Sequence, residues 1–334
     1  MGASLSVLDP KVQATQLLSH ESTQQPTTAP VAQDLRSFIE LQLTSVLNEL
    51  NYAAPAVTEN SAIWEGMRLY ADKTGVPYDE GTHSGKCFKV GYNYPVLCFP
   101  HHPLEVQVFI GIYSWLGLLL DDEAATYLDD FQLFHARFCA GEKQPIPLLQ
   151  GWADLMHEVF KYWDSTVANF IVSASLNFLN ACALQARDGF TQMKRTKAGH
   201  SWAWFMRDKD GVGEAYAWFA FPKTLCPDIS QFLEMIPDLS AWIGLTNDVL
   251  SFWKEEKAGE KQNYIHSRGW YESKDAWDTY EDIVDEVKMK ARDMRLVLGD
   301  RGIHLELLDS YLSGYIAFHI MSSRYRLWEV GLRE

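Results

Sequence analysis

The sequence lacks paired cysteines and clustered basic residues, and each absence argues against a class of protein. Its five cysteines are widely spaced and form no Cys-x-x-Cys pair, which favours a reduced intracellular protein with buried thiols. Its 29 Lys and Arg residues are outnumbered by 44 Asp and Glu residues, giving a formal charge of −15. A nucleic-acid or anionic membrane surface needs clustered cations, so neither partner is expected.

Long apolar runs and strand patterns are also missing. The longest apolar run, residues 108–120, is shorter than the roughly 20 residues that a membrane helix requires. The N-terminus lacks the charged head and apolar core of a signal peptide. We therefore expect a soluble, cytoplasmic protein. Alternating β-branched runs, Asn-Gly hairpins and strand–helix–strand spacing are absent, so a sheet is not expected.

Helical periodicity is what the chain offers instead, from Asp34 onward. We predict an all-α fold in one domain, residues 33–334, after a poorly ordered arm, residues 1–32, that is rich in Ser, Thr, Gln and Pro. The predicted helices are 37–50, 62–72, 103–120, 127–140, 148–163, 169–186, 200–207, 212–220, 229–256 with a bend near Pro237, 273–298 and 303–328. Loops are expected at 79–91, 141–147, 187–199 and 256–269.

One predicted helix carries a polar stripe. In the segment NDVLSFWKE, Asn247, Ser251 and Glu255 recur at intervals of four, so an amide, a hydroxyl and a carboxylate share one face. These hard oxygen donors suit Mg²⁺, which keeps waters that substrate phosphates can replace. A capped helix start followed by an exposed polar edge would give the same pattern.

A cluster of three acidic residues follows the longest apolar run, residues 108–120. Asp121, Asp122 and Glu123 directly follow a run of leucines, and adjacent acids repel one another unless they are solvated or neutralised by a cation. A metal at the mouth of an apolar cavity would account for both features. A solvated helix end is the alternative.

Candidate anion-binding residues complete the set. The segment RDKDG places Arg207, Asp210 and Gly211 about one turn apart, where a guanidinium can bind phosphate bidentately and an Asp can orient it. A glycine-capped helix end is the alternative there. The metal-type ligands are Asp121, Asn247, Ser251 and Glu255, and the diphosphate-type donors are Arg207, Lys254, Arg324 and Tyr325.

In order and separation these motifs resemble the class I terpenoid cyclases, and among them the trichodiene synthase family of fungal sesquiterpene cyclases. The resemblance covers about Val96 to Trp328 and implies a helical bundle around an apolar active-site cavity. There is one departure. Many family members carry a further acid three or four residues after the first Asp pair, where this chain has Ala125 and Thr126.

The resemblance implies three Mg²⁺ ions. Asp121 would bridge two of them from one side of the cavity, and Asn247, Ser251 and Glu255 would hold the third from the other. Because of the missing acid, Asp122 and its neighbour Glu123 receive no role.

The resemblance also implies how a diphosphate is bound. Arg207 would sense it and Asp210 would link that residue to Gly211. The same group would accept hydrogen bonds from Lys254, Arg324 and Tyr325.

The implied activity is Mg²⁺-dependent ionisation of farnesyl diphosphate, followed by cyclisation of the carbocation to a C15 terpene or terpene alcohol. The aromatic residues near the motifs fit either the cavity wall or the core, and they are Tyr113, Trp115, Trp218, Phe219 and Trp242. Alternatives are a cyclase or prenyltransferase of another chain length, C10 or C20, or a relative that binds apolar ligands without catalysis. A chain-elongating synthase normally has two Asp-rich motifs, so Asn247 favours a cyclase. Members of the family often form homodimers.

Overall fold

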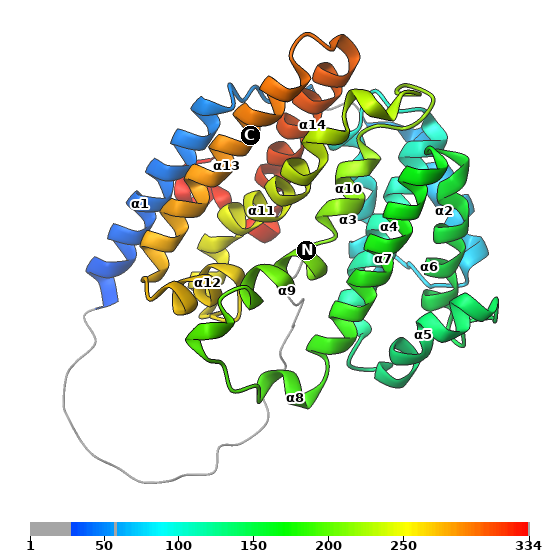
Figure 1. Cartoon of the computed structure of the whole chain (residues 1–334), viewed down its shortest axis with the longest axis horizontal. Coiled ribbons are helices and arrows are strands. Elements are labelled where there is room, and N and C mark those ends of the chain that lie inside the picture. Colours follow the sequence, from blue (N-terminus) through cyan, green and yellow to red (C-terminus); the bar gives the residue numbers. More distant parts are fainter. Residues whose placement is uncertain (1–27, 57–58, 333–334) are drawn as a thin grey trace.

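The computed structural model describes residues 28–56 and 59–332, and over these residues the chain forms fourteen α-helices and no β-strand (Figure 1). The α-helices are α1 (Thr28–Glu49), α2 (Ser61–Thr74), α3 (His83–Cys98), α4 (Leu104–Glu123), α5 (Leu128–Ala140), α6 (Pro147–Glu158), α7 (Ser165–Gln185), α8 (Asp188–Thr191), α9 (Trp202–Asp210), α10 (Gly213–Phe219), α11 (Ile236–Ala258), α12 (Tyr264–Glu272), α13 (Ala276–Leu298) and α14 (Gly302–Met321). Short 3₁₀ helices are η1 (Val159–Lys161), η2 (Lys197–Gly199), η3 (Ile229–Gln231), η4 (Leu233–Met235), η5 (Ser323–Tyr325) and η6 (Leu327–Val330). The all-α prediction is confirmed.

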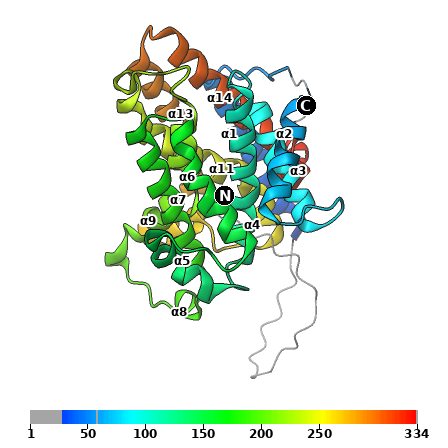
Figure 2. The same ribbon diagram turned by 90° about the vertical axis from the view of Figure 1, so that its right-hand side faces the viewer.

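The centre of the bundle is made by helices that are apolar on most faces. Both views place α11 in the middle (Figures 1 and 2), and Figure 1 shows α1 in contact with α13 along one edge. Helices α4 and α7 are long and apolar enough to cross a membrane, but 78% and 56% of their apolar windows are buried inside the fold. Such burial is what core helices require, since a helix that is apolar all round has to be covered all round.

One expected loop, residues 79–91, is correct only as far as residue 82, because α3 begins at His83. The glycines and the proline of α3 do not mark a turn. A Cβ at Gly91 would come within 2.6 Å of the Gly111 carbonyl oxygen, so this glycine permits close packing of α3 on α4. Pro95 lies inside the last turn of α3. Close contact between helices, rather than a turn, explains the composition.

Other boundaries differ at the ends of predicted elements. Helix α12 lies partly within the expected loop 256–269, because the Asn263 side chain accepts a hydrogen bond from the His266 backbone and caps it. The helix expected across 229–256 is divided, and Pro237 lies in the first turn of α11, where proline is tolerated. Helix α1 begins at Thr28, inside the expected N-terminal arm, and residues 1–27 lie outside the described residues. The boundary of the single domain stays a prediction.

Candidate active site

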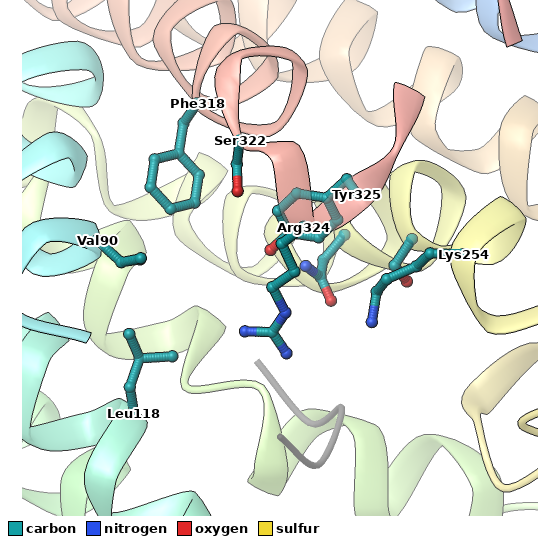
Figure 3. Close-up of a pocket in the computed structure, with 9 residues that line it drawn as sticks. Val90, Leu118, Lys254, Phe318, Ser322, Arg324 and Tyr325 are labelled. Carbon is teal, nitrogen blue, oxygen red and sulfur yellow. The ribbon is translucent and has the colours of Figure 1, made fainter. Parts of the chain in front are cut away.

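A pocket of about 420 Å³, including its mouth, opens between α3, α4, α11 and the chain that follows α14. Its lining residues are Val90, Leu118, Asn247, Ser251, Lys254, Phe318, Ser322, Arg324 and Tyr325. Figure 3 shows Val90 and Leu118 on one side, facing Arg324, Tyr325 and Lys254 on the other, with the Arg324 guanidinium reaching into the opening. An apolar wall thus faces a wall of cations and oxygen donors.

The predicted polar stripe lies on α11 and is buried rather than solvated. Asn247, Ser251 and Glu255 are 8%, 2% and 4% exposed, which excludes the exposed polar edge considered above. Ser251 Oγ has no hydrogen-bond partner among the described residues, although it lines the pocket. An unpartnered buried hydroxyl costs about 1–3 kcal/mol unless a ligand or water meets it. The stripe therefore has capacity for a ligand.

Two residues outside the predicted set bind the ends of this stripe. Asn247 Nδ2 lies 3.1 Å from His319 Nε2. At the other end, Asn263 Nδ2 donates to Glu255 Oε2 at 2.9 Å. Lys254 Nζ lies 3.4 Å from the other oxygen of Glu255. The sequence shows these partners only as polar residues near the motifs, with nothing that pairs them.

Arg207 lies on α9, is 7% exposed, and contacts α11 rather than lining the pocket. Its Nε lies 3.0 and 2.8 Å from the two carboxylate oxygens of Asp248, and its Nη1 lies 3.3 Å from Asp210 Oδ1. Its Nη2 donates to the Gly244 carbonyl at 2.7 Å. Burial lowers the pKa of Arg207, but the two carboxylates outweigh this effect and raise it above its usual value. Asp248, unassigned from the sequence, is thus the main partner of this guanidinium.

The chain turns sharply after Asp210. A Cβ at Gly211 would come within 2.3 Å of Arg207 Nη1, so glycine permits the close approach of the guanidinium. Val212 follows with a φ of 51°, a left-handed conformation that is strained for a β-branched residue. Helix α9 does end before Gly211, whose N–H donates to the Arg207 carbonyl, but Gly211 has right-handed backbone angles instead of the left-handed ones that a glycine cap usually has.

Asp121 lies at the end of α4, one turn beyond the pocket residue Leu118. It is not itself among the lining residues. Burial raises the pKa of Asp121 to about 7, and the carboxylates of Asp122 and Asp210 act in the same direction. Since burial and like charge both disfavour its ionised form, a bound cation would relieve both effects.

Asp122 takes part in a different contact. Its Oδ2 lies 2.7 Å from Nε2 of His83, the first residue of α3. Cys87 Sγ lies 3.6 Å from the same nitrogen. This contact ties the end of α4 to the start of α3, and no role was assigned to His83 or Cys87 from the sequence.

Two cations of the pocket, one on α11 and one after α14, lie near the same aromatic ring. The Arg324 guanidinium lies 6.0 Å from the centroid of the Tyr325 ring, and Lys254 Nζ lies 5.9 Å from it. Burial lowers the pKa of Lys254, and Glu255 opposes this shift. The pocket thus gathers positive charge in a protein whose formal charge is −15.

The five aromatic residues that fitted either a cavity wall or the core are all buried, and none of them lines the described pocket. Trp115 packs edge-on against Phe88, with ring centroids 5.1 Å apart. Trp218 stacks on Phe170 with centroids 5.3 Å apart. The aromatic lining is supplied instead by Phe318, on α14, and Tyr325, on η5.

The chain is similar to known proteins in sequence and in fold. The sequence profile described as trichodiene synthase matches residues 87–334. Longiborneol synthase from Gibberella zeae is 40% identical over 277 residues, covering 82% of both chains, and terpene synthase BipA from Cochliobolus sativus is 34% identical over 287 residues, covering 85% of this chain and 88% of the relative. A solved linalool/nerolidol synthase from Streptomyces clavuligerus superposes with a TM-score of 0.61 at 13% identity, covering 80% of this chain and 99% of that chain.

Proposed function

Because the chain belongs to the trichodiene synthase family and is a terpene synthase, a lyase that acts on isoprenyl diphosphates, we propose that it ionises farnesyl diphosphate and cyclises the resulting C15 carbocation. One observation carries the proposal. The pocket sets a wall of oxygen donors and cations opposite an apolar wall. A substrate with an anionic head and a hydrocarbon tail fits such a pocket in one direction only.

The residues of the polar wall fit Mg²⁺, the cofactor that terpene synthases generally use. Their donor atoms are all oxygens, Ser251 Oγ is buried without a partner, and Asp121 carries a raised pKa that a cation would lower. We propose that three ions bind here, held by Asp121 on one side and by Asn247, Ser251 and Glu255 on the other. Bound Mg²⁺ supplies positive charge that stabilises the leaving diphosphate.

Cationic side chains of the protein also stabilise the leaving diphosphate. Lys254 and Arg324 line the pocket and can donate charge-assisted hydrogen bonds to diphosphate oxygens, which strengthen as the carbon–oxygen bond breaks. Tyr325 adds a hydroxyl to the same wall. Arg207 stands behind this wall, so its sensing role requires it to exchange a carboxylate contact for the diphosphate. Asp210 would then transmit that change to Gly211.

The apolar wall governs what happens to the carbocation. Val90, Leu118 and Phe318 present no nucleophile, and they exclude water while the isoprenyl chain of the substrate cyclises. The rings of Phe318 and Tyr325 can stabilise a passing cation by roughly 0.5–2 kcal/mol.

Cytoplasmic location and a homodimer are also proposals, which rest on the sequence and the family resemblance.

Turnover of farnesyl diphosphate is expected to depend wholly on Mg²⁺. Purified protein incubated with farnesyl diphosphate should release diphosphate and yield a cyclic C15 product by gas chromatography–mass spectrometry, and a chelator should abolish both. Geranyl and geranylgeranyl diphosphates, assayed alongside, should show a lower kcat/KM. A higher kcat/KM for either would reassign the chain length, and no product from any of the three would favour a relative that binds apolar ligands without turnover.

The two neighbouring aspartates of α4 are expected to differ. Asp121→Asn should lower turnover about tenfold or more, because the amide keeps one oxygen donor but loses the charge that holds cations. Asp122→Asn is a matched control of the same chemistry, and turnover should stay within about threefold because Asp122 contacts His83. Steady-state rates at saturating Mg²⁺ make the comparison, and equal losses in the two variants would contradict the assignment of Asp121 alone.

A further inference from the structure

His319 joins α14 to the polar stripe of α11. The side chain is 1% exposed, and both ring nitrogens have partners. Nδ1 lies 2.7 Å from the Tyr315 carbonyl oxygen, one turn back on the same helix, and Nε2 lies 3.1 Å from Nδ2 of Asn247.

These two contacts fix which way the Asn247 amide points. A carbonyl oxygen only accepts hydrogen bonds, so Nδ1 of His319 must carry the ring proton. In the neutral ring Nε2 is then an acceptor, and the atom of Asn247 that faces it must be the donating NH₂ group. Because the two amide heteroatoms point in different directions, Oδ1 is turned away from His319, and it lies 3.4 Å from Arg207 Nη2.

A second contact makes this arrangement rigid. Tyr315 donates its hydroxyl proton to the Ile243 carbonyl of α11 at 3.0 Å. Tyr315 and His319 are four residues apart on α14, as Ile243 and Asn247 are on α11, so two successive turns of each helix are joined. The His319 ring also lies 4.4 Å, centroid to centroid, from that of Tyr325 and cannot turn without displacing it.

We propose that His319 is a positioning residue that holds the Asn247 amide with its oxygen presented to the metal. The inference rests on the proposed function, since it concerns how one Mg²⁺ ligand is oriented. Without the acceptor, only the longer contact of Oδ1 with Arg207 Nη2, at 3.4 Å, holds the amide in this orientation, and the flipped form offers an NH₂ group that cannot bind a cation. Partners that orient a metal ligand typically contribute a factor of 10–100 to metal affinity.

Gln and Leu variants at position 319 separate hydrogen bonding from packing. The two side chains have similar size, but only that of His319→Gln can place an acceptor near the position of Nε2. Calorimetric titration of Mg²⁺ into each protein with inorganic diphosphate present is expected to show half-saturation raised about 10- to 100-fold in His319→Leu and within about threefold of wild type in His319→Gln. The melting temperature without metal shows how far each variant destabilises the fold.

The outcomes distinguish the proposed function from the orienting role of His319. If the wild-type protein binds no Mg²⁺ with diphosphate, the proposed function fails. If it binds, and Gln and Leu weaken binding equally or Leu does not weaken it, the orienting role of His319 is wrong while the proposed function stands. Should His319→Leu fail to fold, His319→Asn replaces it, because its shorter amide can meet the Tyr315 carbonyl but cannot reach Asn247.

Discussion

Glu255→Gln is expected to lower the turnover of farnesyl diphosphate about 10²- to 10³-fold, the largest loss among the polar stripe. Glu255 is the one charged member of that stripe and is 4% exposed, so its charge acts in a medium that screens it weakly. The Gln side chain keeps the shape and one oxygen acceptor for Asn263, but loses the charge that holds Mg²⁺. Rates measured across a Mg²⁺ titration should show weaker Mg²⁺ dependence as well as slower turnover.

The neighbouring residue supplies a control for this variant. Glu256 is also on α11, but it contacts Lys261 and His266 instead of the pocket residues. Glu256→Gln removes the same charge from an adjacent position, and turnover should stay within about twofold because such partly exposed pairs contribute about 1 kcal/mol or less. Equal losses in the two variants would point to the helix as a whole rather than to a ligand at Glu255.

Arg207→Lys should lower turnover about a hundredfold or more, although the positive charge is kept. A lysine has no planar fork and cannot meet both oxygens of Asp248 together with Asp210 and the Gly244 carbonyl, as the guanidinium does. Diphosphate sensing would therefore be lost along with the present contacts. Single-turnover rates with farnesyl diphosphate at saturating Mg²⁺ measure the effect.

Stability has to be separated from chemistry in that variant. Poorer pairing of two buried carboxylates is expected to lower the free energy of unfolding by about 1–3 kcal/mol. Arg295→Lys is the control, since Arg295 likewise meets a carboxylate and a backbone carbonyl, those of Asp309 and Leu50, away from the pocket. Wild-type turnover in Arg207→Lys would show that Arg207 is purely structural.

Most of the fold was predictable because helical periodicity is local. Helix α3 was missed because glycines and a proline favour loops until their neighbours are known. Gly91 is required by the backbone of α4, and nothing within the sequence of α3 reveals how closely another helix approaches it. The half-buried end of α4 and the burial of the middle turns of α11 likewise depend on partners distant in sequence.

The site divides in the same way. The motifs identified Asn247, Ser251, Lys254, Arg324 and Tyr325, which do line one pocket, because spacing along a helix determines a shared face. Their partners could not be predicted, since His319 is 72 residues from Asn247 and meets it only through the packing of α14 on α11. Asp248 is an exception. It lies inside the predicted motif, and the need of a buried guanidinium for a carboxylate could have identified it.

Asn263 affects both the stability of the first turn of α12 and the orientation of Glu255. Its amide oxygen closes the first turn of α12 while its amide nitrogen holds Glu255, so fraying of that helix and orientation of the carboxylate share one side chain. Substitutions on the solvent side of α12 that loosen the cap are therefore transmitted to the polar wall. A substitution in α12 can thus change how Glu255 is held without altering any residue that lines the pocket.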